Sequence, residues 1–279
     1  MGLFQSLRRI DAPEPGADYR AIVSRYKRLR AVSIDLNNKL VERLPSDVID
    51  EGGRKLGMIR GKALFFESES ALSVLMDYCL YDVRRRGVNA IEQYLIDSPP
   101  DPESDEMEYL RAMQHARYSM VLVESVIRGV GVKVCDILAQ EQLLLVDMGF
   151  ARTGVPGALL AARLLYPDGF TMTSGAGLPI GVVRESKREE ATADLTRSVV
   201  CDPDGNFDPA PLIRRCLQDG CAGQIQYQDP TGRIIGPTTG PTHFASTGPP
   251  RRFNKNSPCA CGSGRKYKQC CMKRIAKRP

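Results

Sequence analysis

Several features that mark particular classes of protein are absent from this sequence. It has no tryptophan and only two histidines, and no apolar run reaches the ~18–20 residues that span a bilayer. The first residues, MGLFQSLRRIDAPEPG, contain neither the apolar core nor the cleavage site of a secretory signal. We therefore predict a cytoplasmic protein without a transmembrane segment.

The loops that bind nucleotides or calcium are also missing. The stretch GMIRGKA, from Gly57, is one residue shorter than a Walker A loop and has Ala63 where the magnesium-binding Ser or Thr would stand. The stretch DPDGNFD, from Asp202, lacks the Gly and Glu of the sixth and twelfth positions of a calcium loop. Nothing in the spacing of His115 or His243 indicates a Ser-His-Asp or Cys-His arrangement.

The first part of the chain has the apolar periodicity of helices. Four helices are predicted, over residues 17–44 and 70–86, around residues 91–95 and around residues 107–113. Pro45 should stop the first of them. Its Arg- and Lys-rich face is expected to be solvated, since a run of charge on a helix usually faces water.

From Tyr118 onward the sequence changes to runs of Val, Leu and Ile broken by glycines, which predicts strands. The segment GALLAARLLY is too short for periodicity to decide between a strand and a helix. Beyond Ser186 we expect one helix, capped by Asp208, a hairpin within QIQYQDPTGRIIG, and a linker, PTTGPTHFASTGPP.

Together these patterns predict an α+β fold: a helical N-terminal half, a small antiparallel β domain and a C-terminal zinc knuckle. The predicted boundaries are a mainly helical region, a small β domain, a partly ordered connector and a zinc-binding tail, at residues 1–116, 117–185, 186–250 and 251–279.

Charge is distributed unevenly along the chain. Residues 251–279 carry ten Lys and Arg and no acid, whereas the other 250 residues hold 29 basic and 33 acidic side chains. An acid-free basic tail is typical of segments that interact with acidic partners. The acidic loop 98–108 of the chain itself is one candidate partner.

The same tail contains four of the nine cysteines, in the stretch NSPCACGSGRKYKQCC. Cys259, Cys261, Cys270 and Cys271 offer four thiolates, which form a complete tetrahedral shell for Zn²⁺ and leave no position for a reactive water. Adjacent cysteines rarely form a disulfide, because the geometry is strained. A structural zinc site is therefore predicted, whose metal would supply the folding energy of so short a segment.

The remaining cysteines give weaker signals. We interpret Cys79 and Cys135 as small apolar residues of the core. Cys201, Cys216 and Cys221 have only a weak spacing for a second metal site.

Residues 254–271 resemble the SEC-C motif, the zinc-binding tail of the SecA translocation ATPase. The resemblance rests on Asn256, Pro258, the Cys-x-Cys pair, Gly-Ser-Gly at 262–264, Lys-Tyr-Lys at 266–268 and the final Cys-Cys. It implies a zinc site and docking to a SecB-like chaperone, to translocation machinery or to ribosomes. It covers under a tenth of the chain, and the same motif recurs in otherwise unrelated bacterial proteins.

The leading hypothesis is a non-enzymatic docking protein. Its partner surface would consist of Lys266, Tyr267, Lys268, Lys273 and Arg274. One alternative is nucleic-acid binding by the same basic tail, although Phe253 and Tyr267 are its only aromatics.

A second alternative is an enzyme in the β domain that the tail localises. It predicts a pocket of convergent polar groups near Glu124, Asp136 or Asp147.

Overall fold

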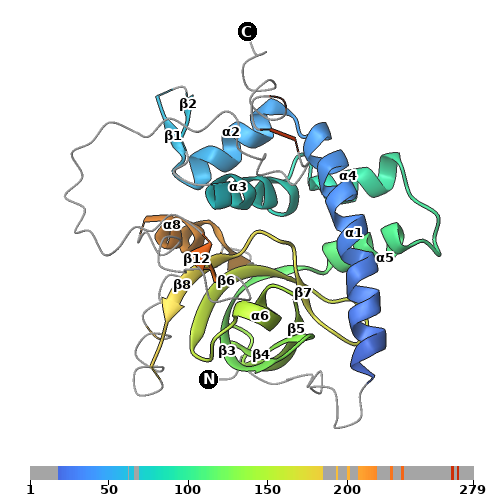
Figure 1. The fold of residues 1–279 in the computed structure, drawn as a ribbon. Helices are drawn as coiled ribbons and strands as arrows, with labels where there is room; N and C mark the ends of the chain where they lie inside the picture. Colours follow the sequence, from blue (N-terminus) through green and yellow to red (C-terminus); the bar gives the residue numbers. More distant parts are fainter. Residues whose placement is uncertain are drawn as a thin grey trace, which may run out of the picture.

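The computed structural model describes residues 18–61, 63–65, 69–184 and 207–218, and short pieces at 193, 200–201, 227–228, 234–235, 265–266 and 269. Helices form the N-terminal half and a curled antiparallel sheet follows, so the mixed helix-and-sheet prediction is confirmed (Figure 1). No described helix is both long and apolar enough to cross a membrane. The predicted domain boundaries stay predictions.

The first helix forms where the periodicity predicts it. α1 spans Tyr19–Arg43, and its N-terminus is capped by Asp18, whose carboxylate accepts hydrogen bonds from the N–H groups of Arg20 and Ala21. Its apolar stripe is buried, including Leu29 and Leu36. Pro45 separates it from a second helix, α2 (Ser46–Lys55).

The sequence gives little sign of α2, because its last turn holds two glycines, which are poor helix formers. The structure explains one of them. A Cβ added at Gly52 would lie 2.5 Å from the Sγ of Cys79, so glycine permits α2 to approach α3 (Glu69–Tyr81). Beyond α2, strands β1 (Ile59–Arg60) and β2 (Ala63–Leu64) form a small hairpin.

The prediction that the second predicted helix, over residues 70–86, continues to residue 86 is wrong. α3 ends at Tyr81, and Arg85 and Val88 exchange two backbone hydrogen bonds around a tight turn in which Arg86 and Gly87 both have positive φ. Such a turn cannot continue a helix. α4 (Ala90–Asp97) then begins with a capping box made by Asn89 and Glu92, and α5 (Asp105–Gln114) with Ser104 as its cap.

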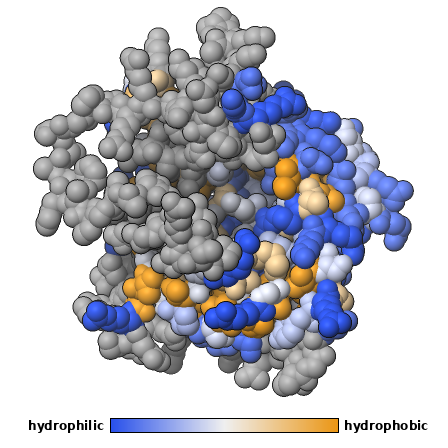
Figure 2. Space-filling view, viewed as in Figure 1, coloured by the Kyte–Doolittle hydropathy of each residue, from blue (hydrophilic) through white to orange (hydrophobic). Residues whose placement is uncertain are grey.

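The basic face of α1 is not simply solvated, as the sequence led us to expect. It lies against the acidic first turn of α5, with ion pairs Arg25–Glu108 at 2.7 Å, Lys39–Glu106 at 3.2 Å and Arg28–Asp105 at 3.4 Å. All three acids belong to the acidic loop 98–108, which therefore has described partners on α1. The surface on this side of the molecule is mostly hydrophilic (Figure 2). The basic tail remains only a hypothetical partner of that loop.

The sheet contains strands β3 (Arg117–Ile127), β4 (Gly131–Asp136), β5 (Glu141–Val146), β6 (Ala158–Leu165), β7 (Met172–Thr173) and β8 (Leu178–Val182). The order is β5-β4-β3-β6-β7, with β8 also on β6, and every pairing is antiparallel. A bridge between Leu145 and Thr171 joins β5 to the residue before β7, so the sheet curls until its two edges meet. GALLAARLLY is therefore a strand, since it supplies β6, which pairs with β3, β7 and β8.

The two faces of the sheet have separate apolar cores. The enclosed face carries Val121, Val123, Val132, Val134, Leu143, Leu145, Ala158, Leu160 and Leu164, and the short helix α6 (Phe150–Thr153) lies within the curl (Figure 1). On β3 the intervening residues Met120 and Leu122 face the other way and join the larger core with the helices. This alternation is the period of a strand buried on both faces.

The chain beyond the sheet is described in pieces. α8 (Ala210–Gln218) begins after Asp208, which accepts a hydrogen bond from the Ala210 N–H at 2.9 Å, and it packs on β6 and β8. Short strand pairs β9 (Val200–Cys201) with β10 (Phe207–Asp208) and β11 (Tyr227–Gln228) with β12 (Ile234–Ile235) complete the assigned elements. The second pair confirms the hairpin within QIQYQDPTGRIIG.

Candidate functional site

The predicted zinc ligands Cys259, Cys261, Cys270 and Cys271 lie outside the described residues, as do Tyr267, Lys268, Lys273 and Arg274. Of the tail, the structure describes Arg265, Lys266 and Gln269, which are exposed, and the Gln269 N–H donates to the Lys266 carbonyl at 2.8 Å. Four thiolates are by their chemistry a fitting donor set for Zn²⁺. Within the described part of the chain, no three His, Cys, Asp or Glu residues gather as a metal site would require.

Cys79 and Cys216 behave as core residues. Both are buried among apolar side chains, and burial raises the pKa of the Cys79 thiol to about 12, so it stays protonated. Cys135 is half-buried on β4. Since Cys216 is enclosed in the core, a metal site that includes it has no support from the structure.

The candidate catalytic acids do not converge on a pocket. In the β4–β5 pairing, Asp136 stands opposite Glu141 at one end, whereas Asp147 follows Val146 at the other end. Glu124 lies at an irregularity of β3, between Val123 and Ser125. The pocket of convergent polar groups expected near Glu124, Asp136 or Asp147 is not found on the enclosed face of the sheet, because apolar side chains fill that face.

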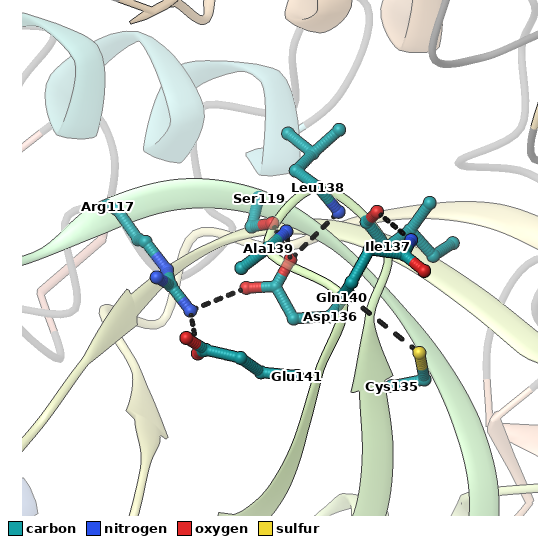
Figure 3. A network of polar contacts seen from close by, with 9 residues as sticks. All are labelled: Arg117, Ser119, Cys135, Asp136, Ile137, Leu138, Ala139, Gln140 and Glu141. Atoms are coloured by element: carbon teal, nitrogen blue, oxygen red, sulfur yellow. Dashed lines mark hydrogen bonds and ion pairs between the residues drawn. The ribbon is translucent and has the colours of Figure 1, made fainter. Parts of the chain in front are cut away.

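Asp136 has a structural role that accounts for its burial (Figure 3). Its Oδ1 accepts hydrogen bonds from the Ser119 hydroxyl and from the N–H groups of Leu138 and Ala139, and its Oδ2 accepts one from Arg117 at 3.0 Å. These bonds fix the turn between β4 and β5. These four contacts, three to Oδ1 and one to Oδ2, account for the burial of Asp136 by its role in the fold.

Asp147 ties α1 to the sheet. Its Oδ1 accepts hydrogen bonds from the N–H groups of Gly149 and Phe150 at the start of α6, and its Oδ2 lies 3.7 Å from Arg30 of α1. Tyr26 of α1 donates to the same oxygen at 3.5 Å. The acid therefore joins three elements and needs no catalytic explanation.

A second group of buried charges lies between α3 and the sheet, and we call it the Arg163 centre: Arg163, Asp77 and Asp82. Arg163 on β6 is 3% exposed and donates to Asp77 at 2.9 Å and, through both terminal nitrogens, to Asp82. Its guanidinium also lies 4.4 Å from the ring centre of Tyr81 and 5.4 Å from that of Tyr118. The centre connects the helical half to the sheet.

The pKa values of Asp82 and Arg163 are shifted because the centre buries two carboxylates with one guanidinium, which leaves one negative charge in excess. Desolvation raises the pKa of Asp82 to about 6, and the neighbouring Arg163 offsets only part of that effect. Burial disfavours the charged guanidinium, yet the two carboxylates together raise the pKa of Arg163 above its ordinary value. The arginine therefore stays charged, while Asp82 gains a proton near pH 6.

The sequence contains one sign of this centre that an analysis of apolar periodicity misses: a charged residue within an apolar segment. Arg163 is the only charged residue of the eight-residue strand β6, all of which is buried. A charge within a buried strand requires a buried partner. The partners lie more than 80 residues earlier in the chain, which is why spacing did not find them.

A pocket of about 310 Å³ lies among the helices rather than in the sheet. The end of α1, the start of α2, the end of α3, the turn after α3 and the length of α4 surround it. Its lining includes Arg43, Arg85 and Arg86, and we call it the arginine-rimmed pocket. It was not expected from the sequence, because the helix predicted to reach residue 86 would not have formed its rim.

Comparison with known proteins identifies the class of chain and its tail. Residues 20–181, more than half of the chain, match a family of unknown function (DUF7986), and the chain belongs to that family. The match runs from α1 to β8. Residues 256–273 match the SEC-C motif, which contains all four tail cysteines, so the resemblance seen in the sequence is confirmed. No curated protein and no solved structure matches the chain.

Proposed function

We propose that this chain is a zinc-dependent docking protein, in which the SEC-C tail binds the partner and the family domain is the body that it brings there. The observation that carries the proposal is the match of residues 256–273 to a motif of zinc-binding type. Cys259, Cys261, Cys270 and Cys271 would hold one Zn²⁺. The metal would supply folding energy to the segment, and its filled shell gives it a structural role.

The partner surface is proposed from charge. Ten cations and no acid in residues 251–279 favour an acidic surface on the partner, and Lys266, Lys268, Lys273 and Arg274 would face it. Tyr267 would be an apolar anchor at the centre of the contact. The resemblance to the SecA tail suggests a SecB-like chaperone, translocation machinery or the ribosome as the partner.

Metal content tests the first part of this proposal. Full-length protein purified without added chelator should contain one zinc per chain by elemental analysis, and Cys270→Ser/Cys271→Ser should lower that value to near zero. Cys135→Ser is the matched control, because it removes a thiol from the body and should leave the zinc in place. Equal zinc in all three proteins would contradict the assignment of the ligands.

Capture from a native lysate tests the second part. The intact chain and the Cys270→Ser/Cys271→Ser chain serve as baits, with nuclease treatment of both. A protein set that appears only on the intact chain is the expected result. Identical capture by both baits would show that docking does not depend on the zinc-folded tail.

The basic tail also favours a second function, which is nucleic-acid binding. Neutralisation of several phosphates by Lys and Arg predicts that affinity falls by orders of magnitude between 50 and 200 mM salt. In the capture experiment, material that nuclease removes from both baits would favour this alternative. Docking through Tyr267 should depend on salt less steeply.

A further inference from the structure

The arginine-rimmed pocket combines an apolar interior with a charged edge. Its interior is formed by side chains that are at least nine-tenths buried: Leu40, Leu44, Val48, Cys79, Val83 and Tyr94. Arg43, Arg85 and Arg86 stand at its edge together with one acid, Asp97. A pocket of mostly apolar lining with a few polar groups at one side is the usual form of a small-molecule site.

The charges at the edge do not cancel. Arg85 forms an ion pair with Asp47, and Asp97 accepts a hydrogen bond from Gln93 at 2.8 Å. Arg43 donates to the Ser98 hydroxyl at 3.3 Å and lies 4.6 Å from the ring centre of Tyr94. With three arginines, Asp97 and Asp47 counted together, one positive charge remains in excess.

That excess is best assigned to Arg86. Among the residues that the structure describes, Arg86 has neither an ion pair nor a hydrogen-bonding or aromatic partner for its side chain. Helix dipoles do not alter the balance, because α1 ends and α4 begins at the same pocket, so their effects oppose each other. The pocket is therefore apolar inside and carries one uncompensated cation at its edge.

The backbone of Arg86 supports a role beyond the turn. Arg86 and Gly87 are the two central residues of the turn that joins Arg85 to Val88, with φ of 51° and 86°. Asn or Gly is strongly preferred at the first of these positions, and a long side chain there is disfavoured. The turn therefore does not account for an arginine at position 86.

We propose that the arginine-rimmed pocket binds an amphipathic anion, with its carboxylate or phosphate held by Arg86 and Arg43 and its apolar body on the floor of the pocket. At ~30 Å³ for each water-sized group, 310 Å³ holds a body of roughly ten non-hydrogen atoms. This is the size class of a medium-chain fatty carboxylate. The proposal does not depend on the zinc tail or on docking.

Isothermal titration of the full-length protein with octanoate tests the proposal. We expect saturable binding with one site per chain. Octan-1-ol, which lacks the charge, and acetate, which lacks the apolar body, should each bind at least tenfold more weakly. Octyl phosphate should bind with an affinity similar to that of octanoate, because the arginines accept either headgroup. Equal binding of octanoate and octan-1-ol would overturn the proposal, as would the absence of octanoate binding.

Variants locate the site. Arg86→Asn should weaken octanoate binding at least tenfold while leaving the melting temperature equal or higher, because asparagine suits the turn. Arg128→Gln is the matched control: Arg128 is an exposed arginine between β3 and β4, far from the pocket in the fold, and its removal should have no effect. Ala90→Leu, which fills the pocket, should also abolish binding.

The same titration separates this proposal from the function of the tail. Cys270→Ser/Cys271→Ser should bind octanoate as the unchanged chain does. If that variant loses octanoate binding while Arg86→Asn retains it, the anion binds at the tail and the assignment to the pocket is wrong.

Discussion

Replacement of Arg163 by methionine should strongly destabilise the protein. Among the described residues, Arg163 is the only cation that contacts Asp77 and Asp82, and the substitution removes it. The side chains of these two acids are 4% and 20% exposed. Removing one partner of a buried ion pair typically costs about 3–5 kcal/mol, because the other charge is left uncompensated. A domain of ordinary stability has ~5–15 kcal/mol in total, so the variant should unfold at much lower urea concentration.

Urea unfolding followed by far-UV circular dichroism measures this loss without a tryptophan, which the chain lacks. Arg163→Lys keeps the charge but not the forked geometry of the guanidinium, so its stability should lie between those of the unchanged chain and Arg163→Met. The triple variant Arg163→Met/Asp77→Asn/Asp82→Asn removes all three charges and should recover most of the loss. A cost below about 1 kcal/mol for Arg163→Met, or a triple variant no more stable than the single one, would refute the account of the Arg163 centre.

Three further predictions concern the body. Asp82 has a folded-state pKa of about 6 against an ordinary value of 3.8, so the folded state binds the proton more tightly and stability should fall by ~2 kcal/mol as pH rises from 4 to 6. Asp82→Asn should lack this fall in stability between pH 4 and 6. Parallel plots of unfolding free energy against pH for the variant and the unchanged chain would contradict the prediction. Gly52→Ala should lower the free energy of unfolding by about 1–3 kcal/mol, because the added Cβ would overlap Cys79 Sγ. Adding Cys79→Ala to that variant should restore part of the lost stability, and denaturant midpoints measure both changes. Zinc chelation should leave the thermal transition of the body unchanged, since its described residues hold no cluster of metal ligands; a lower melting temperature would show that metal supports the body.

Local patterns predicted the elements whose stability depends on nearby residues. The apolar stripe of α1 and the cap of α8 at Asp208 are set within one or two turns of helix, so periodicity and capping residues found them. The predicted length of α3 was wrong because a turn with positive φ at Arg86 interrupts a segment whose composition suits a helix. α2 was missed because Gly52, a poor helix former, serves a contact with α3 rather than the helix itself.

Long-range contacts explain what the sequence did not yield at the candidate sites. The alternative of an enzyme in the β domain named Asp136 and Asp147 among its acids, yet the strand pairing places these two at opposite ends of one hairpin. The basic face of α1 appeared free because its partners on α5 lie 67–83 residues later in the chain. Neither relation can be obtained from spacing alone.

Two of the charged residues in unusual positions are explained by partners within the fold, and a third is not. Asp136 is fully buried, but four donors satisfy it, and Arg163 is buried against two carboxylates. The fold itself explains why both are charged. Arg86 is exposed in a conformation that disfavours it, and no described residue pairs with its side chain. Interactions within the described fold do not explain the arginine at this position, so a bound anion is the better explanation. We therefore assign the anion site to the arginine-rimmed pocket and not to the buried charges of Asp136 or Arg163.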